Sequence, residues 1–248
     1  MSFADLDRQQ VLTKCKLVKW SLQDKKGTLL PLDIEETLAR EVRLEIYFEG
    51  KTFFLEASPH NLDELVLGHA CLEIVPEDCC PVIVKRDGYR FWLEARKKHQ
   101  SGSLSAQPVW TITPEQILIL SKQFRNWPGL WEQTGCFHKA FAWDVRSRNF
   151  LFKVEDVSRH NCIDRIAGLA CKQEFDLKSS VVFVSSRITA SLIKKVIHGS
   201  FVMIVSLSAI SESALQIAMQ CGITLIGFAR KGRFTVFADP FKRVYYAK

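Results

Sequence analysis

Three short polar segments each follow an apolar run in the second half of the chain, and their residue types suit a phosphate group. The segments are Ser185, Ser186 and Arg187 after residues 181–184; Ser206, Leu207 and Ser208 after residues 201–205; and Gly227, Phe228, Ala229, Arg230, Lys231, Gly232 and Arg233 after residues 223–226. Serine hydroxyls donate hydrogen bonds, arginine binds two oxygens at once, and glycine lets the backbone approach closely. Each segment alone is also typical of a helix cap or a basic turn. Together they predict a site for a phosphate-bearing ligand.

The densest polar run is VEDVSRHN at residues 154–161, between an apolar strand and a helix. His160 could transfer protons if Glu155 or Asp156 oriented its ring through a hydrogen bond. The alternative is structural: the acids cap the following helix and Arg159 pairs with them. Composition alone favours the structural alternative.

Cys136 and His138 are two residues apart at the start of a predicted strand, so their side chains should share a face. A nearby imidazole can lower the pKa of a thiol and make it nucleophilic, although a buried, unreactive pair is the default interpretation. The eight cysteines show no repeated spacing and no Cys-x-x-Cys pair. We therefore expect most of them to be small buried residues in a reducing compartment, without a disulfide framework or a metal site.

The pattern of residues 1–110 predicts an N-terminal part rich in β-hairpins. Residues 42–48 alternate apolar and polar side chains, turn at Glu49-Gly50 and pair with residues 52–56. A second hairpin is predicted around Asp87-Gly88. Between them, Asn61 and Glu64 have the spacing of a capping pair at the start of a helix. The polar stretch at residues 96–109 is expected to be an exposed, mobile loop that ends this part.

Residues 111–248 predict a second, larger unit. A helix begins at Thr113-Pro114 and ends near Asn126. Apolar runs at residues 181–184, 201–205 and 223–226 then alternate with helices at 188–198 and 211–220, before a return strand at 234–237. This alternation indicates an open sheet covered on both faces, with ligands at the carboxyl ends of its strands. The fold class is therefore α/β, or α+β for the whole chain, and residues 111–248 form the domain that we expect to bind the phosphate-bearing ligand.

Composition limits the class of partner. The 248 residues carry a formal net charge of +7, and 47% of them are apolar, enough for one large domain or two packed parts. The positive charge favours an anionic partner. Nucleic acid is disfavoured, because the basic residues do not alternate with exposed aromatic residues along one element. Without a long apolar run or a signal-peptide pattern, we expect a cytoplasmic protein that makes no membrane contact.

Five ordered segments resemble the FdhD family, the formate dehydrogenase accessory proteins. They are EVRLEIYFEG with SPHNLDELVLGHACLE, then TGCFHKAFAW, VEDVSRHNCIDRIAG, VSSRITASLIKK and LIGFARKGRFTVF. VEDVSRHN is the most distinctive, since the family has a Glu-Asp-Val-x-Arg-His run there, and the resemblance spans almost the whole chain. It implies a C-terminal half similar to the cytidine-deaminase fold without its zinc ligands, and it implies a homodimer.

The resemblance also implies a function. Family members are thought to carry sulfur from a cysteine desulfurase to the molybdenum cofactor, Mo-bis(molybdopterin guanine dinucleotide), before it enters the formate dehydrogenase catalytic subunit. The family's cofactor-binding segment is similar to residues 228–233. We add Ser186, Arg187, Ser206 and His160 to this predicted site, and we expect GDP to be a partial mimic of the cargo.

The chain departs from the family at the predicted mobile loop. The family has a Cys-Gly-x-Cys motif there, whose cysteine carries a persulfide, but this loop reads HQSGSLSAQPVW. Sulfur transfer needs an exposed thiolate on a mobile segment. Three explanations stay open: the chain binds cofactor without carrying sulfur, another cysteine such as Cys136 substitutes, or loop residues are missing from this sequence. The chain is thus a sulfurtransferase-type carrier or a binding protein.

Two alternatives to the sulfur carrier follow. One is a cofactor-binding chaperone without sulfur transfer. The other is a nucleotide-modifying, deaminase-like enzyme that would use Glu155, Asp156 and His160.

Overall fold

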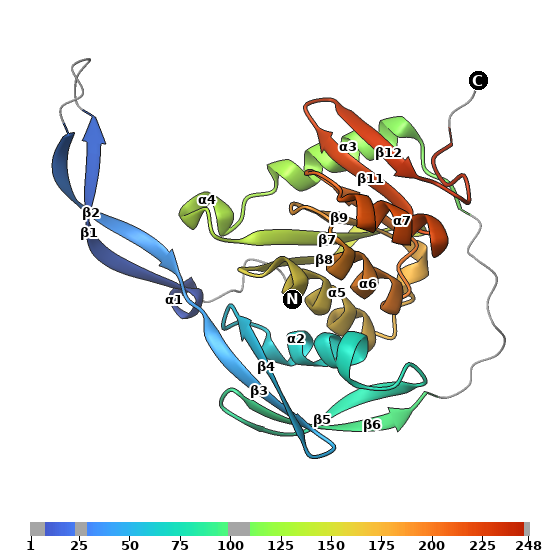
Figure 1. Ribbon diagram of the computed structural model, residues 1–248, viewed down its shortest axis with the longest axis horizontal. Helices are drawn as coiled ribbons and strands as arrows, with labels where there is room; N and C mark the ends of the chain where they lie inside the picture. The colour runs from blue at the N-terminus through green and yellow to red at the C-terminus, as the bar shows by residue number, and fades with distance from the viewer. Residues whose placement is uncertain (1–7, 23–28, 99–109, 246–248) are drawn as a thin grey trace.

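The computed structural model describes residues 8–22, 29–98 and 110–245, which form two sheets, their covering helices and a projecting arm (Figure 1). The larger sheet has six strands in the order β12-β11-β10-β9-β7-β8. Their bounds are β7 (His138–Asp144), β8 (Asn149–Asp156), β9 (Ser180–Val184), β10 (Met203–Ser206), β11 (Thr224–Arg230) and β12 (Arg233–Ala238). Strands β9, β10 and β11 are parallel, whereas β7, β8 and β12 run antiparallel to their neighbours. The predicted parallel strands and return strand are confirmed.

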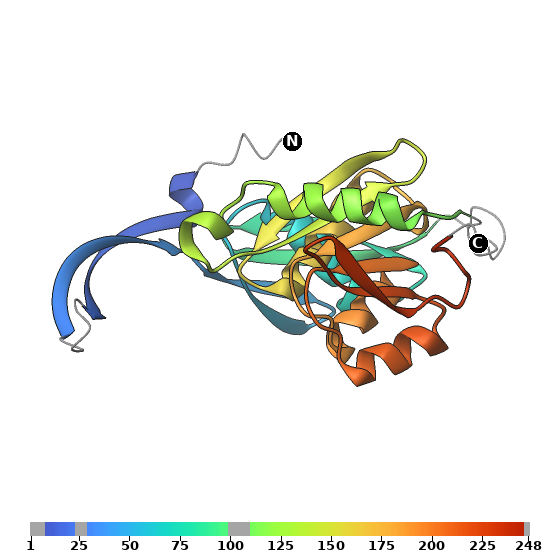
Figure 2. The same cartoon turned by 90° about the horizontal axis from the view of Figure 1, so that it is seen from above.

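Helices cover both faces of the larger sheet, which explains why its central strands are apolar throughout (Figures 1 and 2). One face carries α5 (Arg159–Lys172), α6 (Ala190–His198) and α7 (Glu212–Gln220), and the other carries α3 (Pro114–Asn126). The predicted start of α3 is confirmed, because Thr113 Oγ1 accepts from the Gln116 amide at 3.3 Å and Gln116 Oε1 accepts from the Thr113 amide at 3.0 Å. Two short segments, α4 (Trp131–Thr134) and the 3₁₀ turn η3 (Leu177–Ser179), join these elements.

The smaller sheet has the strand order β4-β3-β6-β5 and packs against a helical segment. Its elements are β3 (Val42–Phe48), β4 (Lys51–Ala57), β5 (Cys79–Asp87), β6 (Arg90–Lys97), α2 (Leu62–His69) and the π-helical turn η2 (Ala70–Ile74). Both predicted hairpins are confirmed.

The predicted capping pair is wrong: Asn61 has a left-handed backbone with φ of 44° and no side-chain cap, and Glu64 instead pairs with Lys172 at 2.7 Å. The predicted loop at 96–109 begins later than expected, since β6 includes residues 96 and 97, and residues 99–109 lie outside the described residues.

The two sheets are joined by the crossing of α2 and α5. The helix backbones touch where glycines face each other: a Cβ at Gly68 would lie 1.7 Å from the Asp164 carbonyl oxygen, and one at Gly168 would lie 1.7 Å from the Glu64 carbonyl oxygen. Only glycine allows this approach. The predicted N-terminal and C-terminal parts are therefore in close contact within the described chain.

A two-stranded arm, made of β1 (Leu12–Leu22) and β2 (Leu29–Ala39), projects from the body and curves away from it (Figures 1 and 2). A short helix, α1 (Arg8–Val11), precedes it. Sequence analysis did not predict the arm. Its large apolar side chains are largely exposed, among them Leu17, Val18, Trp20, Leu30 and Leu32.

The predicted mixed α/β class is confirmed. The likeness to the cytidine-deaminase fold and the domain boundary near residue 110 stay predictions. Among the described residues, no helix is both long enough and apolar enough to cross a bilayer.

Candidate functional site

The predicted site segments lie along one edge of the six-stranded sheet. Strands β8 to β11 end there, and the antiparallel strands β7 and β12 begin there. The edge therefore gathers the start of β7, the N-terminus of α5, the two serine-containing loops and the turn between β11 and β12. Carboxyl strand ends of such sheets are the usual place for ligands.

The β11–β12 turn presents open backbone on this edge. Arg230 and Arg233 are cross-strand partners, so their charges lie on either side of the turn. Phe228, Lys231 and Gly232 have φ of 54°, 55° and 71°, and the Phe228 amide donates to the Ser208 carbonyl at 2.9 Å. Left-handed backbone is uncommon at non-glycine residues and is often found at ligand sites. Because no atom lies within 4 Å of a Cβ built at Gly232, a ligand could approach the backbone there.

A pocket of about 210 Å³ opens between this turn and α3. Four basic residues line it, namely Lys122 and Arg125 from α3 and Arg230 and Lys231 from the turn. Ser121, also in the lining, is 4% exposed, and its hydroxyl has no hydrogen-bond partner in the structure. Buried hydroxyls normally find a partner. A pocket lined by four cationic side chains and by the Ser121 hydroxyl, which can donate a hydrogen bond, suits an anion with several oxygens, such as a pyrophosphate.

The predicted serines have mainly structural contacts. Ser206 is fully buried; its hydroxyl donates to the Ser186 carbonyl at 2.7 Å and accepts from the Ser208 amide at 2.8 Å. The Ser186 hydroxyl donates to the Arg187 carbonyl at 3.3 Å. These bonds fix the two loops to each other. That either hydroxyl contacts a ligand stays a prediction.

A second cationic group lies at the N-terminus of α5. Burial, Arg159 and Arg187 lower the pKa of His138. Burial and then Arg159 and Lys195 lower the pKa of His160, whose Nε2 lies 3.1 Å from the Ser191 hydroxyl. Both imidazoles are therefore neutral at pH 7, and the arginines, with the positive end of the helix dipole, keep this end of the edge cationic.

The carboxylates of the VEDVSRHN run do not orient His160. Glu155 accepts from the Leu130 amide at 2.9 Å, and its pKa is raised by burial. Asp156 accepts from Arg165 at 2.6 and 2.9 Å and from the Ser158 amide at 3.0 Å, just before α5 begins. Both acids therefore have structural partners, but neither caps α5 as predicted, since Glu155 binds the Leu130 amide and Asp156 binds the amide of Ser158, which precedes the helix. The predicted partner Arg159 is also wrong, because Asp156 pairs with Arg165.

Glu155 also fixes the chain entering β7. A Cβ at Gly129 would lie 2.2 Å from Glu155 Oε1, so a larger residue in the turn before α4 would force the buried Glu155 carboxylate to move. Lys139 adds a second anchor by donating to the carbonyls of Arg125 and Trp127 at 3.2 and 2.7 Å. The end of α3, and with it Arg125 of the pocket, is therefore held against the sheet edge.

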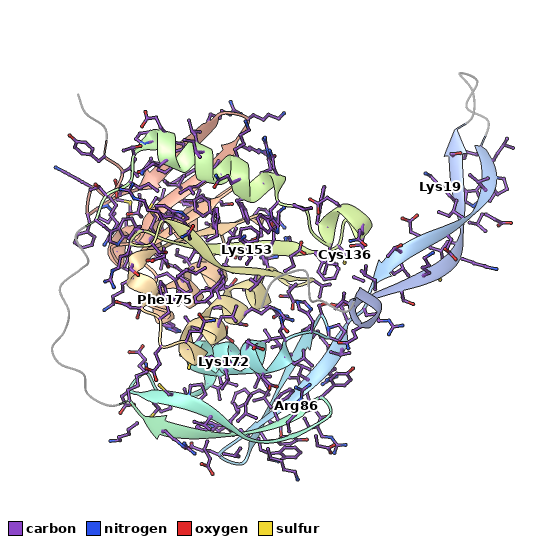
Figure 3. All side chains as sticks on the ribbon, turned by 180° about the vertical axis from the view of Figure 1, so that it is seen from behind. Lys19, Arg86, Cys136, Lys153, Lys172 and Phe175 are labelled. Carbon is purple, nitrogen blue, oxygen red and sulfur yellow. The ribbon has the colours of Figure 1, made fainter. Side chains whose placement is uncertain are left out.

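Cys136 lies beside α4, on the side of the molecule from which the arm projects (Figure 3). It is exposed, and its amide donates to the Thr134 hydroxyl at 3.1 Å. Residue 136 precedes β7, which begins at His138, and the groups that shift the pKa of His138 do not include this thiol. The structure therefore gives no support to an activated Cys136–His138 pair. Within the described residues, no group of three or more His, Cys, Asp or Glu side chains could hold a metal ion.

The sequence model of the FdhD/NarQ family matches residues 77–244, which are 168 of the 248 residues. The chain belongs to the FdhD/NarQ family. A sulfur carrier protein FdhD from Bacillus subtilis is 31% identical over 246 residues, covering 84% of this chain and 90% of that protein. Protein FdhD from Methanocaldococcus jannaschii is 29% identical over 209 residues, again covering 84% of this chain and 90% of that protein.

A solved structure has a similar fold. It is a crystal structure of a candidate formate dehydrogenase accessory protein from Desulfotalea psychrophila, with a TM-score of 0.77 and 20% identity, covering 95% of this chain and all of that one. The FdhD/NarQ match contains α3, the β11–β12 turn and the whole sheet edge.

Sequence analysis missed the contribution of α3. Lys122 and Arg125 lie more than 100 residues before the turn that they face. The only signal in the sequence was their position on the polar side of an amphipathic helix, which is also where ordinary solvated residues lie.

Proposed function

We propose that this chain is an accessory protein for formate dehydrogenase that binds a molybdenum cofactor through its guanine nucleotide and takes part in its sulfuration. The names of its relatives, sulfur carrier protein FdhD among them, support the general role. The observation that carries the binding part is the four-cation pocket beside residues 228–233. The pyrophosphates of Mo-bis(molybdopterin guanine dinucleotide) are the kind of anion that such a pocket attracts, and we propose the cofactor as cargo, with GDP as a partial mimic.

We propose that different residues along the sheet edge contact different groups of the cofactor. Arg230, Lys231, Lys122 and Arg125 neutralise the pyrophosphate, and the Gly232 backbone lets it approach. Arg159 and Arg187, at the other end of the edge, can hold a second anionic group. His138 and His160, which are neutral at pH 7, offer hydrogen bonds rather than charge. The proposed partners are a cysteine desulfurase, the formate dehydrogenase catalytic subunit and a second copy of the chain, in the cytoplasm.

Genetic complementation tests this function. A bacterium that lacks its own family member would receive this chain, and formate dehydrogenase activity would be measured in extracts. We expect the unaltered chain to restore activity and the double variant Arg230→Ala/Arg233→Ala to restore less than about a tenth of it, because Arg230 lines the pocket and Arg233 is its cross-strand partner beside it. Arg146→Ala, an exposed change in the turn between β7 and β8 at the opposite edge, is the matched control. Full restoration by the double variant would remove this site from the function.

A chaperone without sulfur transfer is the second candidate. The observation that favours it is the loop sequence HQSGSLSAQPVW, which has no cysteine. Intact-mass spectrometry after incubation with a cysteine desulfurase and cysteine separates the two: a gain of one sulfur, about 32 Da, indicates a carrier. Cofactor binding without this gain indicates the chaperone. The deaminase-like alternative depended on Glu155 and Asp156 acting with His160. Both carboxylates instead bind other groups, Glu155 the Leu130 amide and Asp156 the Arg165 side chain, so this alternative is not favoured.

A further inference from the structure

The root of the arm is built into the same edge of the larger sheet as the candidate site. One apolar cluster joins the arm and its short helix to the body, with Val11, Leu12 and Ala39 on one side and Leu130, Phe137 and Val157 on the other. Phe137 immediately precedes β7, and Val157 lies between β8 and α5, so both belong to this edge. Strand β2 also contacts α4. The site edge therefore sets the direction in which the arm leaves the body (Figure 1).

The stem of the arm, residues 13–16 and 35–38, is polar. Half of its residues are charged, namely Lys14, Lys16, Glu35 and Glu36. Lys14 Nζ lies 2.6 Å from the Glu35 carboxylate, and both side chains are exposed. Exposed ion pairs of this kind are well solvated, so the stem does not need a covering partner.

The outer part of the arm, residues 17–21 and 29–34, is apolar on both of its faces. Paired residues of antiparallel strands share a face, and successive residues of a strand alternate between faces. Trp20 pairs with Pro31, and Lys19 pairs with Leu32. This register places three exposed apolar side chains on each face: Val18, Trp20 and Leu29 on the first, and Leu17, Leu30 and Leu32 on the second. Each of these six residues is between 41% and 63% exposed.

Such a surface indicates that another molecule covers the outer part of the arm. Single exposed apolar side chains are ordinary, whereas contiguous apolar patches mark interaction sites. A two-stranded hairpin without further packing is also marginally stable in water at best. A covering partner would therefore bury the apolar side chains and stabilise the arm at the same time.

Three features favour a cleft in a protein as the place where the outer part binds. A flat surface, such as the arm of a second copy, would cover one face and leave the other in water, whereas a cleft encloses both. Lys19, labelled in Figure 3, and Asp33 are the only charged residues of the outer part, so its net charge is zero and it does not attract anionic lipid or nucleic acid. Pro31 has no amide, and prolines in edge strands hinder the addition of a further strand.

We propose that the outer part of the arm inserts into an apolar cleft of the formate dehydrogenase catalytic subunit. This inference rests on the proposed function, in which that subunit receives the cofactor. The inserted length is about 20 Å, which corresponds to six residues of a strand. Because the arm root and the candidate site share one edge, insertion of the arm turns the site edge towards the subunit that receives the cofactor.

Photo-cross-linking from both faces of the arm tests the proposal. The full chain would carry the photoreactive residue p-benzoylphenylalanine in place of Trp20 or Leu30, which lie on opposite faces, or in place of Glu36 in the stem as the matched control. Each protein would be irradiated with the cofactor-free catalytic subunit from the bacterium used for complementation. We expect positions 20 and 30 both to cross-link to the catalytic subunit, and position 36 to give little of this product, because the stem stays in water.

Substitutions in the arm provide a second measurement. Trp20→Ser and Leu30→Ser should each weaken binding to the catalytic subunit by about tenfold or more, since each removes a large apolar side chain from a buried contact. Both variants should bind GDP as tightly as the unaltered chain, which would show that the body is folded and the pocket intact. Glu36→Ser, the stem control, should bind both the subunit and GDP as the unaltered chain does.

Four results would overturn the proposal. They are cross-linking from only one of positions 20 and 30, cross-linking mainly to a second copy of the chain, co-sedimentation with phosphatidylglycerol vesicles that Trp20→Ser abolishes, and unchanged subunit affinity in both serine variants. Failure of the proposed function is a different outcome: an unaltered chain that neither binds GDP nor restores formate dehydrogenase activity would reject that function, whatever the arm contacts.

Discussion

At the scale of single residues, burial gives His60 an acid–base behaviour unlike that of a free imidazole. It is 7% exposed, its Nδ1 lies 3.1 Å from the Ser58 hydroxyl, and burial followed by the charge of Arg165 lowers its pKa well below the ordinary value. The unfolded chain binds this proton near pH 6.5, and the folded chain does not. His60 therefore makes the folded state less stable as pH falls below the unfolded pKa.

The substitution His60→Gln tests this. We expect the free energy of unfolding of the unaltered chain to fall more steeply between pH 7 and pH 5 than that of the variant. The two slopes should differ by up to about 1.4 kcal/mol per pH unit, which corresponds to the uptake of one proton on unfolding. Urea unfolding at several pH values gives both slopes. Equal slopes would mean that His60 takes up a proton in the folded protein.

At the scale of elements, the glycine contact between α2 and α5 decides how the smaller sheet attaches. A glycine-to-alanine change inside a helix ordinarily stabilises it by about 0.5–1 kcal/mol. Gly68→Ala should instead destabilise the protein by about 1–3 kcal/mol or more, because the added Cβ would lie 1.7 Å from a backbone oxygen that cannot rotate away. Urea unfolding measures the change, and Ser213→Ala, an exposed position of α7, is the control, expected within about 0.5 kcal/mol of the unaltered chain. A stabilised Gly68→Ala protein would contradict this crossing.

The elements differ in how well the sequence predicts them, and the reasons are physical. The strands β9, β10 and β11 are buried on both faces, so they appear as unbroken apolar runs, and each helix between them is followed within two residues by a glycine. The arm was missed because its apolar side chains are exposed and interleaved with charges, without the clean alternation of a half-buried strand. The Asn61 cap failed because the same spacing can serve a left-handed turn.

The site was predicted only where its residues are contiguous. The turn at 228–233 was identified from its own composition, whereas the contribution of Lys122 and Arg125 depends on contacts between distant segments. A single sequence carries no direct signal for such contacts. The same limit explains why Arg165 was not recognised as the partner of Asp156.

At the scale of the whole molecule, Arg165 links the two predicted parts. It is 2% exposed, pairs with Asp156 of β8, and donates to the carbonyls of Ser58, His60 and Asn61 at 2.9, 2.5 and 3.1 Å. We expect the body of the protein to unfold in one cooperative transition, because both sheets share this contact and the α2–α5 crossing.

Arg165→Met should lower the free energy of unfolding by about 3–5 kcal/mol, since Asp156 would be left buried and unpaired. Asp63→Asn, which breaks the exposed Arg86–Asp63 pair of 2.8 Å, should cost less than about 1 kcal/mol and serves as the control. Calorimetry and urea titration would follow both variants. Two separate transitions in the unaltered chain would contradict a shared core between the parts.

The central claim is that the cationic pocket beside the β11–β12 turn binds a guanine nucleotide, and isothermal titration calorimetry with GDP tests it most directly. We expect the unaltered chain and Arg146→Ala to bind GDP equally, and Arg230→Ala/Arg233→Ala to bind it at least tenfold more weakly, a loss of about 1.4 kcal/mol or more. Lys122→Ala should weaken binding in the same direction, because its side chain lines the same pocket. Unchanged GDP affinity in the double variant would contradict the account.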